Sequence, residues 1–288
     1  MVGLLPATAL ATVGTGTSSG TVIYVSGSGD DSAAGDESAP LKTIGAAFAK
    51  AADGDTICLL SDIVLPSETV LSGDKSITLA GKADETAKKI TYTKDTSTTS
   101  TDLYMIKIGV EYGTATATNI TLENVTIDAE AQDIRCIRVC PESTLTLENK
   151  ATVCNGRAVH EDYATGTNDW GGGIVVDSTA KLIMNEGSAV TDCSAEQGGG
   201  IYLSGEMELN GGMLSGNTAV GDHFGTSLSR SAHGGAILIR ANRADYDESY
   251  DVPAKLTMTG GNIQNNKAAS DLSAFGGAVA ILGTPKTL

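Results

Sequence analysis

Short pairs of aliphatic residues recur along the chain in three fixed columns, and the two residues of each pair stand two positions apart. The first column is Ile137/Val139, Ile174/Val176, Ile201/Leu203, Ile237/Ile239 and Val279/Ile281. The second is Ile120/Leu122, Leu145/Leu147, Leu182/Met184, Met207/Leu209 and Leu256/Met258, and the third is Val125/Ile127, Val153, Val190, Leu214 and Ile263. Residues two apart on a strand point to the same face, so each column predicts short strands with one buried face.

The order of the columns never reverses, which excludes a series of hairpins. The economical arrangement is a coil of three strands that stacks on itself, each strand pairing in parallel with its equivalent in the next coil. Successive first-column strands begin at residues 174, 201, 237 and 279, and the extra residues of the longer coils fall in corners, where insertions are tolerated. The pattern therefore predicts an all-β, parallel β-helix with three strands per coil.

Glycines precede every first-column strand from Ile174 onward. They fit a tight corner that needs positive φ or close backbone approach. A phosphate-binding loop is not indicated, because no Lys-Ser/Thr pair follows and no helical pattern begins. Asn217 and Asn266 each stand three residues after a third-column anchor, so we expect them to bond backbone groups of neighbouring coils.

The N-terminal part predicts a cap for the open end of the coil stack. Ile44, Ala47, Phe48 and Ala51 recur at helical spacing, which predicts an amphipathic helix over about residues 41–52. We expect the β-helix to occupy residues 21–288. Because Leu288 falls where the second column is due to resume, we also expect further coils or domains in a longer parent chain.

Two stretches resemble known proteins. Residues 24–60, "YVSGSGDDSAAGDESAPLKTIGAAFAKAADGDTICLL", look like the N-terminal cap of right-handed parallel β-helices of the pectin-lyase-like superfamily. The phrases "GGGI", "GGAI" and "GGAV", with "LSGN" and "IQNN", resemble the repeats of polymorphic outer-membrane, adhesin-like passenger domains, although Leu214 and Ile263 replace the Phe of their FxxN motif.

The resemblance implies a right-handed coil and a role with glycans, either as a surface adhesin or as a polysaccharide lyase or glycosidase. Lyases of this fold typically hold calcium with Asp or Glu and use a basic residue as the base, and its glycosidases use clustered aspartates. Neither signature can be carried onto this sequence residue by residue, which favours a binding protein over an enzyme.

The net charge argues against nucleic acid as a partner, and the N-terminal residues indicate the cellular compartment. The 288-residue chain has a formal net charge of -16, which argues against nucleic acid. Residues 1–20 hold a short apolar run, an Ala-x-Ala triplet at residues 9–11 and a Ser/Thr/Gly stretch, which we interpret as a signal-peptide remnant and spacer. No apolar run of about 20 residues follows. We expect a secreted or cell-surface protein.

The five cysteines are scattered and form no CxxC pattern, which favours buried thiols over a zinc site or a disulfide framework. Among possible pairs, Cys154 with Cys193 is the first to examine, because both stand near one corner of neighbouring repeats.

One corner collects the residues typical of a binding site. Between the third column and the next double glycine the chain is long at residues 156–170, short at 193–197 and long again at 220–233, which predicts two walls and a floor. The predicted ligand-binding residues are Tyr163, Asp169, Trp170, Glu196, Gln197, Phe224, Arg230 and His233. The catalytic candidates, for an enzyme at this edge, are His160, Glu161, Asp162, Asp222 and His223.

Alternatives remain at each site. Long loops can simply collect polar residues while Trp170 and Phe224 pack onto the coil beneath them. Calcium is the one cofactor considered, at Asp30, Asp31, Asp36 and Glu37, and the alternative there is a solvated loop. The leading hypothesis is an adhesin-like or glycan-binding β-helix stalk whose partner is a polysaccharide or a host or cell-surface glycan. A polysaccharide-active enzyme and a purely structural spacer are the alternatives.

Overall fold

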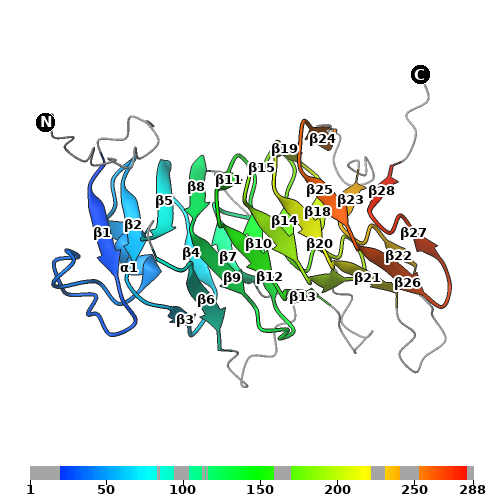
Figure 1. The fold of residues 1–288 in the computed structure, drawn as a ribbon. Helices are drawn as coiled ribbons and strands as arrows, with labels where there is room; N and C mark the ends of the chain where they lie inside the picture. The colour runs from blue at the N-terminus through cyan, green and yellow to red at the C-terminus, as the bar shows by residue number, and fades with distance from the viewer. Residues whose placement is uncertain are drawn as a thin grey trace, which may run out of the picture.

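The chain winds through three long parallel sheets, named A, B and C, whose strands are given below (Figure 1). Each turn passes through sheet C, then sheet A, then sheet B. The computed structural model describes residues 20–82, 85–93, 104–111, 114, 116–158, 170–221, 231–240 and 253–283. All strand pairs in these sheets are parallel, and the equivalent strands of successive coils lie side by side. The structure is therefore a parallel β-helix, which is right-handed like nearly all parallel crossovers.

Each sheet takes one strand from each coil. Sheet A contains β1 (Val22–Val25), β2 (Thr56–Leu59), β5 (Lys75–Gly81), β8 (Thr118–Glu123), β11 (Thr144–Leu147), β15 (Lys181–Met184), β19 (Glu206–Leu209) and β24 (Lys255–Met258). Sheet B contains β3 (Ile63–Leu65), β6 (Lys88–Tyr92), β9 (Val125–Asp128), β12 (Thr152–Cys154), β16 (Ala189–Thr191), β20 (Met213–Ser215) and β25 (Asn262–Gln264). Sheet C contains β4 (Thr69–Leu71), β7 (Tyr104–Ile108), β10 (Arg135–Val139), β14 (Ile174–Val176), β18 (Ile201–Leu203), β23 (Ile237–Arg240) and β28 (Val279–Leu282).

Shorter strands line the corner between sheets B and C. A fourth sheet, sheet D, contains β13 (Arg157–Ala158), β17 (Ser194–Ala195), β21 (Thr218–Gly221) and β26 (Lys267–Ser270), and β22 (Ala232–His233) pairs with β27 (Ala274–Phe275).

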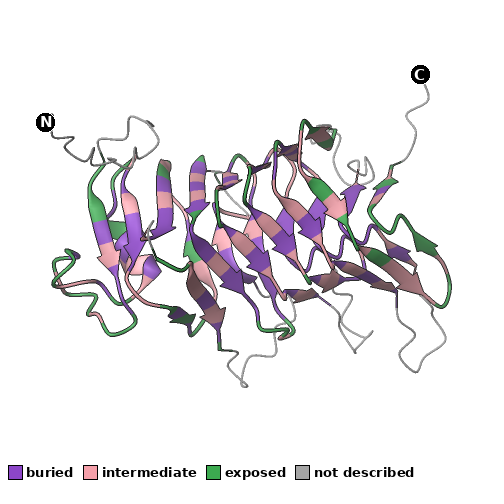
Figure 2. Cartoon of the chain, viewed as in Figure 1, coloured by how far each residue is buried: buried purple, intermediate pink, exposed green. Residues whose placement is uncertain are grey.

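The register confirms the three predicted columns. In sheet C, Ile137 pairs with Ile174, which pairs with Ile201 and so on to Val279. The second column lies in register in sheet A, and Val153, Val190, Leu214 and Ile263 do so in sheet B. In the coils before the last one these side chains fill the interior, and Figure 2 shows their strands coloured as buried. In the last coil Met258 and Ile281 are 51% and 73% exposed, because no further coil covers them. The same stacking extends to earlier coils that the columns did not include, as where Ile57 pairs with Leu79.

The helix that closes the N-terminal end is shorter than predicted. Helix α1 (Ile44–Lys50) lies inside the predicted 41–52 segment and buries Ile44, Ala47 and Phe48. Thr43 is its N-cap, and the Thr43 Oγ1 accepts a hydrogen bond from the Ala46 amide at 3.1 Å. Leu41 instead bridges to Val25 of β1, which removes the first predicted turn from the helix.

The three glycines before β18 have three different reasons to be glycine. Gly198 has φ +67, in the left-handed region. A Cβ on Gly199 would lie 2.4 Å from the Thr218 carbonyl of its own coil, and one on Gly200 would lie 2.9 Å from Asn217 Cγ. The repeated glycines therefore make a corner that turns sharply and leaves room for a neighbouring backbone and a ladder side chain.

The asparagines form the expected ladder at this corner. The Cys193 amide donates to Asn217 Oδ1 at 3.1 Å, and Asn217 Nδ2 donates to the Val190 carbonyl at 2.9 Å. Asn217 is fully buried, and both its backbone amide and Nδ2 donate to Asn266 Oδ1 of the next coil. Side-chain amides thus take over backbone bonding where the chain turns and the sheet ladder is interrupted.

Candidate functional site

The predicted corner is present, and three of its residues lie on successive coils. Trp170 bridges to Gln197, and Gln197 bridges to His233, both in parallel. His233 pairs in turn with Phe275, and the two rings stack with centroids 5.2 Å apart. Trp170, Gln197 and His233 therefore lie on one shared edge of the stack.

Much of the predicted site lies outside the described residues. This applies to the loop positions His160, Glu161, Asp162, Tyr163, Asp169, Asp222, His223, Phe224 and Arg230. Of the predicted floor, Glu196 is 9% exposed, and Gln197 Oε1 accepts a hydrogen bond from Arg240 Nη1 at 3.1 Å. Burial lowers the pKa of His233, so the neutral imidazole is favoured there.

Trp170 packs onto the coil, as the alternative interpretation expected, and its position creates an aromatic platform. Its ring lies face to face on Tyr202, with centroids 4.6 Å apart and planes 4° apart. The guanidinium carbon of Arg240 lies 5.6 Å from the Trp170 ring, and Arg135 Nε donates to the Trp170 carbonyl at 2.9 Å. Trp170 keeps part of its surface exposed, so an aromatic ring, an amide and a guanidinium meet at one surface position.

Tyr202 belongs to a row of outward-facing residues in the middle of the sheet C strands. The row is Lys107, Arg138, Val175, Tyr202, Leu238 and Ala280. Its last four members are buried although they point away from the coil interior, and Trp170 and Leu282 pack against them. The outer face of sheet C is therefore charged over the earlier coils and apolar and aromatic over the later ones.

The charged half gathers around Tyr104, at the start of β7. Lys107, Arg135 and Arg138 lie 5.5, 5.2 and 5.7 Å from the centre of its ring. We call these residues, together with three carboxylates, the Tyr104 cluster; the carboxylates belong to Glu68, Glu111 and Asp177.

Ion pairs join the cluster across coils. Lys107 Nζ lies 3.3 Å from both Glu68 Oε1 and Glu111 Oε2, and Arg138 pairs with Glu111 and Asp177. Burial by itself would lower the pKa of Lys107, but the two carboxylates outweigh it and raise that pKa. Burial opposes the charge of Arg138 in the same way, and Asp177 leads the groups that raise its pKa above the ordinary value. Both cations therefore stay protonated near neutral pH.

The acidic N-terminal segment is held by local hydrogen bonds. Asp31 Oδ1 accepts from the Lys42 and Thr43 amides at 2.9 and 2.8 Å, and Asp30 and Asp36 accept from the amides of Ser32 and Ser38. Glu37 pairs with Lys82. In the part of the chain that the structure describes, no group of three or more His, Cys, Asp or Glu side chains is arranged to hold a metal ion.

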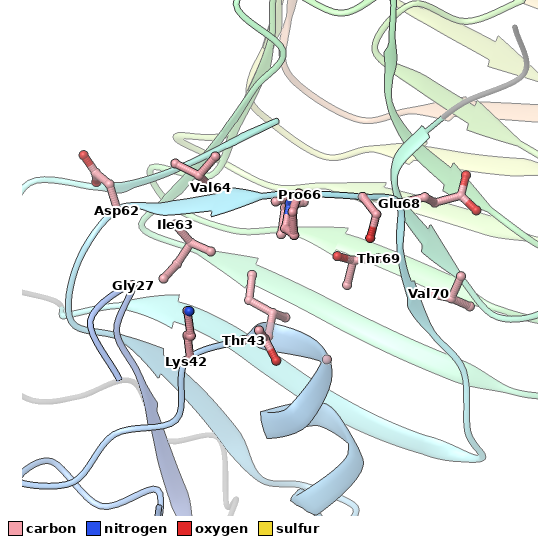
Figure 3. A pocket seen from close by; sticks show the side chains of 14 residues that line it. Gly27, Lys42, Thr43, Asp62, Ile63, Val64, Pro66, Glu68, Thr69 and Val70 are labelled. Atoms are coloured by element: carbon pink, nitrogen blue, oxygen red, sulfur yellow. The ribbon is translucent and has the colours of Figure 1, made fainter. Parts of the chain in front are cut away.

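A cavity of about 600 Å³ lies between the start of α1 and the β3–β4 connection (Figure 3). Ile63, Pro66, Glu68 and Thr69 line one side, and Lys42 and Thr43 line the other. This cavity could not be predicted from the sequence, because its walls come from the first coil, outside the repeat columns. The titratable side chains in its lining are one Lys, one Asp and one Glu: Lys42, Asp62 and Glu68.

Comparisons with known proteins give little. No family model and no curated protein matches the chain. Among solved structures, a rhamnogalacturonan lyase is similar at 10% identity over 77% of this chain and 82% of that chain, with a TM-score of 0.34. None of the described helices is long and apolar enough to span a membrane.

The sequence reading missed the Tyr104 cluster, Tyr202 and Arg240. A signal was available in the middle residue of each first-column strand, which changes from Lys107 and Arg138 to Val175, Tyr202 and Leu238 along the stack. The aliphatic pairs on either side define the interior, so the residue between them defines the outer face.

Proposed function

We propose that this protein binds glycans on the outer face of sheet C, and that it is a secreted or cell-surface, adhesin-like stalk. The observation that carries the proposal is the Trp170 ring stacked on Tyr202 beside the hydrogen-bonded pair of Gln197 and Arg240. Sugar rings pack on aromatic faces, and amide and guanidinium groups bond sugar hydroxyls. The loop residues Tyr163, Asp169, Phe224 and Arg230, which precede Trp170 and His233 in sequence, belong to the same proposed site.

Charge favours a neutral ligand over a polyanion. The Tyr104 cluster contains three cations and three carboxylates, so it has no net positive charge. The whole chain carries a formal net charge of -16, which repels polyuronates at low ionic strength. A neutral polysaccharide or a neutral cell-surface glycan is therefore the proposed partner.

An array of neutral and acidic glycans tests the proposal. The wild-type chain should bind neutral glycans. Trp170→Ala should weaken that binding by at least about tenfold, whereas Trp170→Phe, which keeps a stacking ring, should retain more of it. Tyr24→Ala changes an aromatic residue on sheet A and serves as the control, with thermal unfolding of each variant checked alongside. Equal binding by the wild type and Trp170→Ala would exclude this site.

The second candidate is a polysaccharide lyase or glycoside hydrolase, which the concentration of titratable groups in the Tyr104 cluster and the sequence candidates His160, Glu161, Asp162, Asp222 and His223 favour. Against it, a lyase base must be deprotonated, and the pKa of Lys107 is raised. Neutral and uronate polysaccharides, assayed for unsaturated products and for reducing ends with and without calcium, distinguish the two. Formation of either product would support the enzyme. Glycan binding without product formation would support the stalk. The absence of both glycan binding and turnover would support a structural spacer.

A further inference from the structure

Two cysteines, Cys136 and Cys193, lie at the glycine corner. At the equivalent positions of later coils the chain has a glycine in place of Cys136 and an asparagine in place of Cys193. Because Arg157 pairs with Ser194 and Ser194 with Thr218, the residues just before them, Gly156, Cys193 and Asn217, occupy equivalent places in three successive coils. In the same way Cys136 is equivalent to Gly173, since Ile137 pairs with Ile174. The earlier coil thus has Cys136 and Gly156 where the next has Gly173 and Cys193.

This exchange places the two sulfur atoms in one small space. A Cβ on Gly156 would lie 2.8 Å from Cys136 Sγ, so the Cys136 thiol fills the position below Cys193 in the ladder. A Cβ on Gly173 would lie 3.0 Å from Cys193 Sγ. Each glycine makes room for one sulfur, and the two thiols occupy adjacent levels that neighbouring strands separate by about 4.8 Å.

Both thiols are closed off from solvent. Cys136 is 0% exposed and Cys193 1% exposed, and both are free thiols that belong to the interior core. A hydrogen bond with Cys193, followed by burial, raises the pKa of Cys136 well above its ordinary value. In the folded chain the Cys136 thiol is therefore unreactive, because the thiolate is the nucleophile in exchange reactions.

We propose that Cys136 and Cys193 are a cross-linking site that joins two successive coils as a disulfide, formed by exchange with a small-molecule disulfide before the corner closes during folding. One thiolate attacks the external disulfide and releases one thiol, and the second thiolate displaces the other. Two S–H bonds are lost and one Sγ–Sγ bond forms. The external disulfide takes up the two electrons and two protons as two thiols.

Cys154 is the competing partner, and the sequence placed it first. Val153 of β12 points into the core, so Cys154 beside it points outward, level with Asp128 and Thr191. Its Sγ accepts a hydrogen bond from Asn155 Nδ2 at 3.6 Å, while its carbonyl accepts one from the Cys136 thiol at 3.4 Å. Burial raises the pKa of Cys154 to about 12. The partner of Cys193 inside the corner is therefore Cys136.

Peptide mapping of the full chain tests the proposal. The reduced, denatured chain is refolded with oxidised and reduced glutathione, denatured in an alkylating reagent and cut with chymotrypsin, because trypsin leaves Cys136 in a three-residue peptide. The expected product is a linked pair of peptides containing Cys136 and Cys193, with Cys154 alkylated. Cys154→Ser is the matched control and should form the same link, while Cys136→Ser and Cys193→Ser should not.

Burial and stability give a second readout on the wild-type chain. The link should resist a reductant in the native protein and yield to it in denaturant, and it should raise the midpoint of thermal unfolding by about 5 °C relative to the reduced chain, since it joins residues 57 positions apart. Alkylation of both Cys136 and Cys193 after refolding in glutathione overturns the proposal. A link from Cys154 to either residue overturns it as well.

Discussion

Arg138 donates from Nε to Asp177 Oδ2 at 2.9 Å, and both side chains are only 16% exposed. Arg138 lies on β10, Asp177 follows β14 of the next coil, and Glu111, which pairs with Arg138 Nη1 at 2.5 Å, follows β7 of the coil before. One guanidinium therefore joins three successive coils on the outer face of sheet C, through ion pairs that are largely shielded from water.

Removing this guanidinium should be costly. Arg138→Ala leaves two part-buried carboxylates without their shared cation, and it should lower the free energy of unfolding by about 3–5 kcal/mol in denaturant titrations. Arg157→Ala is the matched control, because the Arg157–Asp133 pair is 41% and 48% exposed, and it should cost less than about 1 kcal/mol. Similar losses in the two variants would mean that burial of the Arg138 pairs contributes nothing.

Two glycine-to-alanine changes should act in opposite directions. A Cβ on Gly200 meets the Ala236 carbonyl oxygen at 2.8 Å and Asn217 Cγ at 2.9 Å, so Gly200→Ala should destabilise the chain by about 1–3 kcal/mol. A Cβ on Gly45 in α1 meets nothing within 4 Å, so Gly45→Ala should stabilise it by about 0.5–1 kcal/mol. Thermal unfolding of both variants checks the pair. A Gly200→Ala protein as stable as the wild type would contradict the packing described for the corner.

The Asn217 side chain should be irreplaceable by a smaller residue. Asn217→Ala leaves the buried Cys193 amide and Val190 carbonyl without their partners and should cost about 2–4 kcal/mol. The exposed Asn210, which bonds the side chains of Asn185 and Thr259, is the control, and Asn210→Ala should change the free energy of unfolding by less than about 0.5 kcal/mol. Denaturant titration of both variants gives the comparison, and equal effects would remove the ladder as a source of stability.

Asp128 should make the fold sensitive to acid. Burial alone would raise its pKa, but hydrogen bonds from Lys89, Asn155 and the Glu130 amide outweigh burial and hold the pKa below its ordinary 3.8. A lowered pKa in the folded state adds stability above the unfolded value, and that stability is lost as the pH falls below about 3.8 through the folded pKa.

Asp128→Asn is the variant that tests this. It should reduce the free energy of unfolding near neutral pH and flatten its decline in acid, measured by denaturant titration from about pH 7 to about pH 3. An unchanged acid profile in Asp128→Asn would assign the acid sensitivity to other carboxylates.

The interior of the fold could be predicted because one physical rule governs it. Ile137 and Val139 must both face inward on a strand, and every later coil repeats that constraint in register, so the columns align the sheets without a structure. The Asn217 ladder was predictable for the same reason, since the position recurs in Asn266. The strands of the first coils could not be assigned to the columns from the sequence, because long connections separate them, as between β6 and β7.

The candidate site was harder to predict because it depends on contacts between corners and faces. Trp170 was recognised from its position beside the glycine corner, but its partner Tyr202 stands 32 positions later, and only the coil stacking brings the two rings together. The thiol pair shows the same limit. Cys154 is nearer to Cys193 in sequence than Cys136 is, yet the alternation of its strand turns it outward.

The corner packing has a consequence for the length of the molecule. Gly173 and Cys193, and likewise Gly200 and Asn217, belong to the same coil, so each coil holds both the vacancy and the side chain that fills it. A tandem copy of residues 174–200 brings a complete set with it and adds about 4.8 Å along the axis. Gene duplication or deletion can thus lengthen or shorten the β-helix in whole steps without redesigning its interior.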